Sequence, residues 1–271
     1  MDHKIARYKI QEKIARGAES VLYVGEAGSE RYCVKTIRNW LGRLIAPSNI
    51  RAYGEKVKVP YRSKVKHLTN EFSIGRKLQR DTDMPVVRMY ALRRRNVFFF
   101  ELGYDLIMEY IDGDDLGDRR ALKMLRLEDK VNYFYQTALA LQYIHQTGFL
   151  HLDMKPSNIM VARGVVKLID FGVSVQIGER PRSIAGTSGY MSPEQLARGT
   201  VDEGTDIFAL GITWNVIFGG RRLHQNNEEF KGRATKMEAQ FHMAKMDVPM
   251  IDDVPELRGE HPELEQLIRD C

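Results

Sequence analysis

Cysteine is scarce in this chain, which has only two among its 271 residues, Cys33 and Cys271. Two cysteines cannot build the disulfide framework that small secreted domains depend on. The first residues, 1–7, also lack the apolar core of a secretory signal peptide. We therefore expect the chain to work in a reducing cytoplasm.

Long apolar runs are missing too. No stretch of about 18 or more apolar residues occurs, so the sequence predicts no transmembrane segment. There are no internal repeats and no low-complexity stretches, and a hydrophobic content of 43% is enough for a folded core. Apolar periodicity predicts a helix from Asp129 to Gln146, ended by Gly148. The polar, Met-bearing stretch from Glu228 to Lys245 is a further candidate helix.

Two short segments carry most of the chemistry. Residues 151–158 read His-Leu-Asp-Met-Lys-Pro-Ser-Asn, and Asp-Phe-Gly follows at 170–172. These residue types suit phosphoryl transfer, in which the protein supplies cations and fixes the geometry. Mg²⁺ prefers carboxylate and amide oxygens, so Asn158 and Asp170 are candidate metal ligands. Asp153 is the candidate that orients an attacking hydroxyl and takes its proton.

Together the two segments resemble the protein kinase family. The resemblance implies an α+β fold with a small antiparallel-sheet N-lobe, which has one key helix, and a larger, mainly helical C-lobe. It places these lobes at 1–111 and 112–271, and it implies an ATP- and Mg²⁺-dependent serine/threonine kinase. Lys155, expected beside the γ-phosphate, is the serine/threonine form of this loop. Leu152 stands where many members have arginine, which makes the loop a non-RD one.

The N-terminal half carries the matching lysine. An alternating stretch predicts a hairpin that turns at residues 27–29 and returns through Tyr-Cys-Val to Lys35. The resemblance implies that Lys35 contacts the α- and β-phosphates and pairs with Glu71, on a helix that we expect to open at Asn70. It also implies an apolar residue at position 75, where this chain has glycine.

The resemblance assigns further residues to the nucleotide. The family's phosphate-covering loop has three glycines, whereas this chain keeps only Gly17, which predicts a stiffer lid. Residues 106–113 resemble the connector whose backbone binds adenine. The residues expected around the nucleotide are Ile14, Gly17, Leu22, Cys33, Lys35, Met108, Glu109, Ile111, Asp115 and Met160.

The segment 186–194 resembles the end of the family's activation loop and favours a protein substrate. Thr187 is expected to touch Asp153 and Lys155, and Asp206 to anchor the catalytic-loop backbone. The family's late arginine motif, which pairs with the glutamate at 194, is absent. Either the C-lobe is truncated at its C-terminal end or Glu194 has another partner, such as Arg221 or Arg222.

The positive charge is concentrated in one segment. The net charge is +5, and residues 36–66 hold eight lysines and arginines against one glutamate. This segment is longer than most members of the family need between strand and helix. It is either a solvated loop or a docking surface for an acidic protein or an anionic membrane surface. Its sparse aromatic residues disfavour nucleic acid.

Two rivals to an active protein kinase remain. A pseudokinase that acts as an ATP-binding scaffold is favoured by the depleted glycine loop and by Gly75. A small-molecule kinase of the same fold is disfavoured by Lys155 and by the segment 186–194. Against the pseudokinase, all five expected catalytic and metal-binding residues are present: Lys35, Glu71, Asp153, Asn158 and Asp170.

Overall fold

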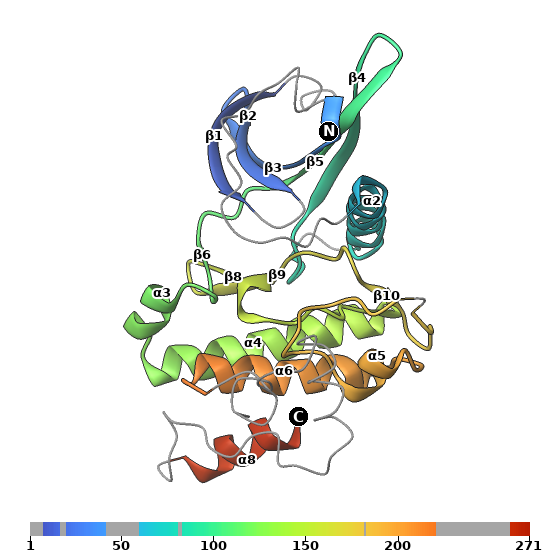
Figure 1. Cartoon of the computed structure of the whole chain (residues 1–271). Coiled ribbons are helices and arrows are strands. Elements are labelled where there is room, and N and C mark those ends of the chain that lie inside the picture. The colour runs from blue at the N-terminus through green and yellow to red at the C-terminus, as the bar shows by residue number, and fades with distance from the viewer. Residues whose placement is uncertain (1–7, 17–19, 42–59, 81–82, 182, 221–260) are drawn as a thin grey trace, which may run out of the picture. The chain divides into compact units, whose positions relative to one another are not determined.

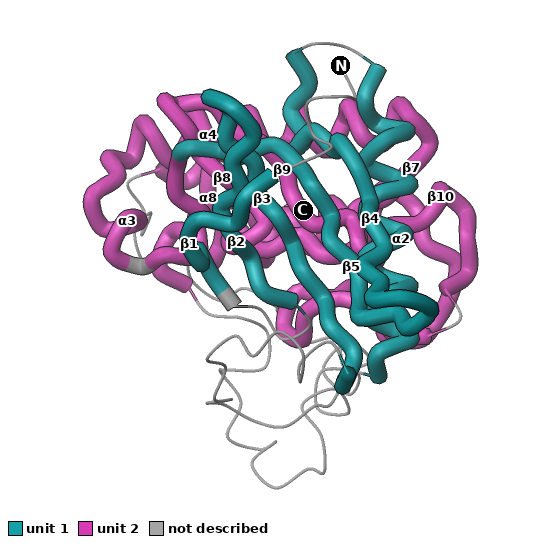
Figure 2. Tube along the Cα trace, turned by 90° about the horizontal axis from the view of Figure 1, so that it is seen from above, with its two compact units in different colours: residues 1–112 teal, residues 113–271 magenta. Residues whose placement is uncertain are grey.

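The computed structural model describes residues 8–16, 20–41, 60–80, 83–181, 183–220 and 261–271. The chain divides into two compact units, Met1–Asp112 (unit 1) and Gly113–Cys271 (unit 2), which Figure 2 shows in teal and magenta. Unit 1 is built on an antiparallel sheet and unit 2 is mainly helical (Figure 1). The fold is therefore α+β, as predicted.

The sheet of unit 1 has five antiparallel strands in the order β1-β2-β3-β5-β4. Its strands are β1 Lys9–Arg16, β2 Val21–Ala27, β3 Glu30–Arg38, β4 Met89–Val97 and β5 Phe100–Glu109. The predicted hairpin between β2 and β3 is confirmed, and Gly28 makes its turn with φ of +67°, a backbone angle that suits glycine. Val34, Leu106 and Ile107 are fully buried and form part of the core of the sheet.

One helix, α2 Tyr61–Lys77, packs against this sheet. The expectation that it opens at Asn70 is wrong, because the helix begins nine residues earlier. Pro60 precedes the first turn, and the hydroxyl of Tyr61 donates to Glu101 at 2.7 Å, which ties the start of the helix to β5. The basic segment 36–66 is therefore not all loop, since its first residues end β3 and residues 61–66 are helical.

The missing side chain at Gly75 has a counterpart in β4. A Cβ at Gly75 would lie 2.5 Å from Cγ of Met89, whose side chain is fully buried. Met89 therefore fills the volume beside α2 that a larger residue at position 75 would need.

Unit 2 is organised around two helices, α4 Leu127–Gln146 and α6 Glu203–Ile217. The predicted helix ending at Gln146 is confirmed, and Gly148 follows it with φ of +85°. Trp214 of α6 is fully buried against Phe134 of α4, with ring centroids 5.1 Å apart. The other helices among the described residues of unit 2 are α3 Arg119–Met124, α5 Pro193–Ala197 and α8 Pro262–Asp270, with a 3₁₀ turn at Pro156–Asn158.

Short strands complete unit 2. β6 Asp114–Asp115, β8 Ile159–Ala162 and β9 Val165–Leu168 form one small sheet, and β7 Phe149–Leu150 pairs with β10 Val175–Gln176. The candidate helix from Glu228 to Lys245 lies outside the described residues. Among the helices that are described, none is long and apolar enough to cross a membrane.

Candidate active site

In unit 1, β3 and α2 bring Lys35 and Glu71 together. Their Nζ and Oε2 atoms lie 2.8 Å apart, and the side chains are 15% and 2% exposed. Glu71 belongs to the buried face of α2, with Leu68 and Ile74 as buried neighbours one turn away on either side. A buried carboxylate needs a cationic partner, so this ion pair fixes where the lysine lies.

Four expected nucleotide contacts share one face of the sheet. Directly opposite residues of an antiparallel pair point to the same side, as do residues two apart on one strand. Leu22 is opposite Lys35, and Met108 is opposite Cys33, two residues before Lys35. Burial raises the pKa of Cys33 to about 12, so its side chain is a neutral thiol.

The remaining expected contacts are placed separately. Ile14 is half exposed on β1, and Gly17 lies outside the described residues. Glu109, at the end of β5, accepts the backbone N–H of Arg88 at 3.1 Å, and Ile111 is partly exposed. In unit 2, Asp115 of β6 is opposite Met160 of β8. Burial raises the pKa of Asp115 although its carboxylate accepts the Gly117 N–H at 2.8 Å.

The loop 151–158 of unit 2 is held through its backbone. The buried carboxylate of Asp206 accepts the N–H groups of His151 and Leu152, each at 2.8 Å. His151 Nδ1 accepts the Asp153 N–H at 3.2 Å, so the ring donates from Nε2 to the carbonyl of Ile169 at 3.0 Å. The expectation that Asp206 anchors this backbone is confirmed by these contacts.

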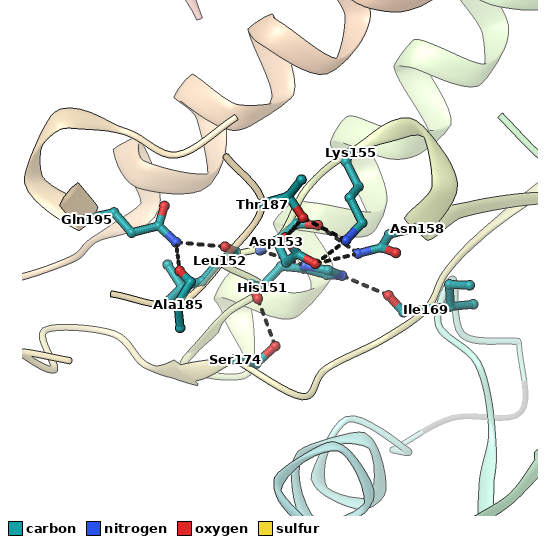
Figure 3. Close-up of polar contacts among 10 residues, drawn as sticks. All are labelled: His151, Leu152, Asp153, Lys155, Asn158, Ile169, Ser174, Ala185, Thr187 and Gln195. Atoms are coloured by element: carbon teal, nitrogen blue, oxygen red, sulfur yellow. Dashed lines mark hydrogen bonds and ion pairs between the residues drawn. The ribbon is translucent and has the colours of Figure 1, made fainter. Parts of the chain in front are cut away.

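Asp153 lies at the centre of a polar cluster (Figure 3). Its Oδ2 is 2.6 Å from Lys155 Nζ, and its Oδ1 accepts the hydroxyl of Thr187 at 2.6 Å. Lys155 Nζ also donates to the Thr187 oxygen at 2.8 Å. A hydroxyl is therefore held between a carboxylate and an ammonium group.

A backbone hydrogen bond next to Asp170 holds its segment beside Asn158. The Asn158 side-chain nitrogen donates to the carbonyl of Asp153 at 2.8 Å, which leaves the amide oxygen as its group for ligating a cation. The Asn158 carbonyl accepts the N–H of Ile169, the residue before Asp170, at 3.1 Å. Asp170 adopts φ of +68°, which is uncommon outside glycine. An amide and a carboxylate oxygen fit the preference of Mg²⁺ for hard oxygen ligands.

Two residues that the sequence analysis left without a role also contact this loop. The Gln195 amide nitrogen donates to the carbonyls of Leu152 at 2.8 Å and Ala185 at 2.5 Å, and the side chain is 3% exposed. Ser174 donates to the carbonyl of His151 at 3.0 Å. A polar residue just after the 186–194 motif was the only signal in the sequence for Gln195.

Glu194 is satisfied by hydroxyl groups. Its Oε1 accepts from Ser192 and from Thr205, both at 2.6 Å. Thr205 is a buried residue in the first turn of α6, so Glu194 links α5 to α6. Arg221 and Arg222, the partners considered from the sequence, lie outside the described residues.

Comparison with known proteins decides the family. Residues 8–271 match the family model described as protein kinase domain. The chain is a member of the protein kinase family. Among curated proteins it is 31% identical over 152 residues to a "cAMP-dependent protein kinase, catalytic subunit-like" of Caenorhabditis elegans. The aligned residues cover 55% of this chain and 35% of that protein.

Two further relatives of this protein kinase are named as serine/threonine kinases. A probable serine/threonine-protein kinase of Dictyostelium discoideum is 30% identical over 222 residues, or 80% of this chain and 40% of the relative. Serine/threonine-protein kinase PknA of Mycobacterium tuberculosis is 29% identical over 156 residues, or 55% and 35%. The matched part thus spans well under half the length of these relatives.

Proposed function

We propose that this kinase domain transfers the γ-phosphate of ATP to serine or threonine hydroxyls of protein substrates. The contact between Thr187 and Asp153 carries the proposal. It holds a hydroxyl 2.6 Å from a carboxylate oxygen and 2.8 Å from Lys155 Nζ. A substrate hydroxyl needs the same two neighbours, one to take its proton and one to offset negative charge on the phosphoryl group.

Each residue then has a chemical role. Asp153 orients the hydroxyl and accepts its proton as the oxygen attacks phosphorus. Lys155 offsets charge on the γ-phosphate, and Lys35, held by Glu71, binds the α- and β-phosphates. Asn158 and Asp170 are the residues that would hold Mg²⁺, which neutralises phosphate charge when it is bound. ATP and Mg²⁺ are thus the proposed cofactors.

The packing of Gly75 weakens the pseudokinase alternative. Glycine at this position was one of two features that favoured a domain without turnover. Met89 occupies the adjoining space, so the glycine leaves no hole beside α2. The paired Lys35 and Glu71 and the ordered Asp153 cluster support a catalytic domain instead.

Transfer of labelled phosphate from ATP to a generic protein substrate tests this function. We expect Asp170→Asn to abolish transfer because a proposed Mg²⁺ ligand is lost. We expect Asp153→Asn to lower turnover about 10²–10⁴-fold while nucleotide binding changes little. Asp270→Asn, an exposed carboxylate on α8, is the matched control. Wild-type turnover in purified Asp153→Asn would refute the assignment.

The basic segment 36–66 is the proposed docking site for an anionic partner, either an acidic protein or an anionic membrane surface. Lys64 and Lys66 lie on α2, whereas Lys56 and Lys58 lie outside the described residues. The scarcity of cysteine supports a cytoplasmic location for this interaction.

Reversal of these four lysines to glutamate tests the docking proposal. We expect association to weaken strongly at low salt and little near 1 M salt, where the Debye length is only about 3 Å. Catalysis on a generic substrate should be unchanged. Unaltered binding to acidic proteins and to anionic vesicles would make the segment a solvated surface.

A further inference from the structure

Four large aromatic side chains are exposed at one end of the sheet of unit 1. Phe98 and Phe99, in the turn between β4 and β5, are 89% and 99% exposed. Phe100, the first residue of β5, is 64% exposed, and Trp40 is 73% exposed. We name these four residues the aromatic tip. Isolated exposed apolar residues are ordinary on protein surfaces, but a contiguous group of this size marks an interaction site.

The β4–β5 hairpin extends beyond the other strands of the sheet and carries the three phenylalanines of the tip at its end. β3 pairs with β5 only as far as Gly103, whereas the pairing of β4 with β5 continues to Val97 and Phe100. The hairpin therefore runs past the other strands, as Figure 1 shows at β4. Phe98 has φ of +51°, a backbone conformation that is uncommon for a residue other than glycine. Its side chain is exposed and contributes nothing to the core.

Asn39 places Trp40 next to the same hairpin. Its backbone N–H donates to the carbonyl of Leu102 at 3.0 Å, and its side-chain amide donates to the carbonyl of Glu101. Both carbonyls belong to the first residues of β5, directly after Phe100. Trp40, the next residue, is thus held near the backbone that follows the three phenylalanines.

Cations surround the base of the tip. Residues 93–101 hold three arginines, Arg93–Arg95, against one acidic residue, Glu101, and Arg95 also pairs with Asp105 further along β5. Arg94 pairs with Glu101 at 2.8 Å but stays 56% exposed. The contact of Tyr61 with Glu101 brings the start of α2 to the same place, where Arg62 and Lys66 are exposed one turn apart. The surroundings of the aromatic tip are therefore positive.

We propose that the aromatic tip inserts into the interfacial region of an anionic lipid bilayer, with Arg62, Lys66 and Arg94 near lipid phosphates. Aromatic residues favour this region, and nearby cations add attraction to anionic lipid. The side chains of a tight turn point in several directions, which a fluid bilayer accommodates better than a protein groove does. The proposal shares Trp40, Arg62 and Lys66 with the basic segment 36–66 and rests, for these residues, on the docking role proposed above. It uses no residue of the candidate active site and does not depend on turnover.

Co-sedimentation with vesicles tests the proposal. The full chain is mixed with vesicles of phosphatidylcholine alone and of phosphatidylcholine with phosphatidylglycerol. We expect binding to the anionic vesicles, and we expect the triple variant Phe98→Asn, Phe99→Ser, Phe100→Ser to bind at least about tenfold more weakly. Asparagine is chosen at 98 because it tolerates the positive φ. The control removes three exposed apolar side chains of unit 2: Met124→Ser, Tyr135→Ser and Val165→Ser.

Tryptophan fluorescence gives an independent readout. The chain has two tryptophans, Trp40, which is exposed, and Trp214, which is fully buried. On insertion, Trp40 emission should shift to the blue and become protected from iodide. The Trp40→Phe variant, which keeps Trp214, should show no shift. Melting temperature and phosphate transfer show that each variant is folded.

Three outcomes would overturn the proposal. The wild type fails to bind anionic vesicles, or binds neutral vesicles equally well, or the tip variant binds like the control. The wild type could instead fail to bind vesicles but self-associate with rising concentration, and the triple tip variant could lose that self-association. In that case the aromatic tip binds a second copy of the chain and not a bilayer. We also expect the inactive Asp153→Asn variant to bind anionic vesicles as the wild type does. Vesicle binding can then be judged independently of kinase activity.

Discussion

At the scale of single residues, Thr187 is the most informative side chain of the site. It lies 34 positions from Asp153 in the sequence, yet its hydroxyl donates to that carboxylate and accepts from Lys155. Before a substrate binds, these contacts keep two groups of opposite charge in a fixed geometry. Fixed geometry is a large part of what an enzyme contributes to phosphoryl transfer.

The hydroxyl of Thr187, rather than its methyl group, should matter for catalysis. We expect Thr187→Ala to slow phosphate transfer by about tenfold, because Asp153 and Lys155 lose the hydroxyl that both of them contact. Thr187→Ser should keep most of the rate, and Ser183→Ala, at an exposed position of the same segment, should keep all of it. The measurement is the steady-state rate of phosphate transfer to one protein substrate. Equal rates for Thr187→Ala and Thr187→Ser would contradict the expectation.

At the scale of elements, side-chain contacts attach the segment 185–195 to the loop 151–158. Leu152 packs in an apolar cluster with Leu150 and Val201. Gln195 of α5 bonds the carbonyls of Leu152 and Ala185 and so joins the two segments. Ser174 is buried and bonded to His151, which removes it as an accessible phosphorylation site.

Basal activity should therefore be independent of phosphorylation and dependent on Gln195. We expect phosphatase treatment to leave initial rates nearly unchanged. Gln195→Ala should lower both the rate and the stability, the latter by about 2 kcal/mol, because the carbonyls of Leu152 and Ala185 lose their donor.

Gln266→Ala, on the exposed face of α8, is the matched control for Gln195→Ala. A loss of more than about tenfold on dephosphorylation, restored by autophosphorylation, would show that a phosphate orders the segment after all.

At the scale of the whole molecule, the two units are stabilised by different means. Unit 2 has an apolar helical core that includes Trp214 and Phe134. Unit 1 has a fully buried carboxylate, Asp105, which pairs with Arg38 at 2.7 Å and Arg95 at 2.5 Å. Burial alone would raise the pKa of Asp105, but the two arginines and a hydrogen bond from Tyr8 lower it below its usual value.

Acid should destabilise unit 1 through Asp105. A carboxylate with a lowered pKa contributes stability that is complete above its unfolded pKa, about 3.9, and is lost as the pH falls further. Near neutral pH, Asp105→Asn should cost about 3 kcal/mol because two arginines lose their counter-charge. The difference in melting temperature between wild type and variant should narrow below about pH 4.

Hydrogen exchange locates this effect. Lost protection in Asp105→Asn should fall within unit 1, because Tyr8, Thr36, Arg38 and Arg95, which hydrogen-bond to Asp105, all belong to that unit. Exposed Asp112→Asn serves as the control. A gap in melting temperature that does not change with pH would show that Asp105 is not the titrating group.

The sequence by itself determined the family and identified the candidate catalytic residues. Asp153, Lys155 and Asn158 lie in one short segment, so their spacing alone restricts how their side chains can approach one another. The β2–β3 hairpin and the helix ending at Gln146 were also predictable, because a turn glycine and an apolar period are local signals.

Contacts between distant segments were decided only by the tertiary structure. The start of α2 depends on Tyr61 reaching Glu101, 40 positions away, and Gln195 meets Leu152 across 43 positions. Met89 fills the space beside Gly75 from another strand. Residues 98–100 are apolar enough for a buried strand, yet they are exposed because β3 ends before it reaches them. Local patterns report what a residue prefers, whereas its burial depends on which neighbours the folded chain supplies.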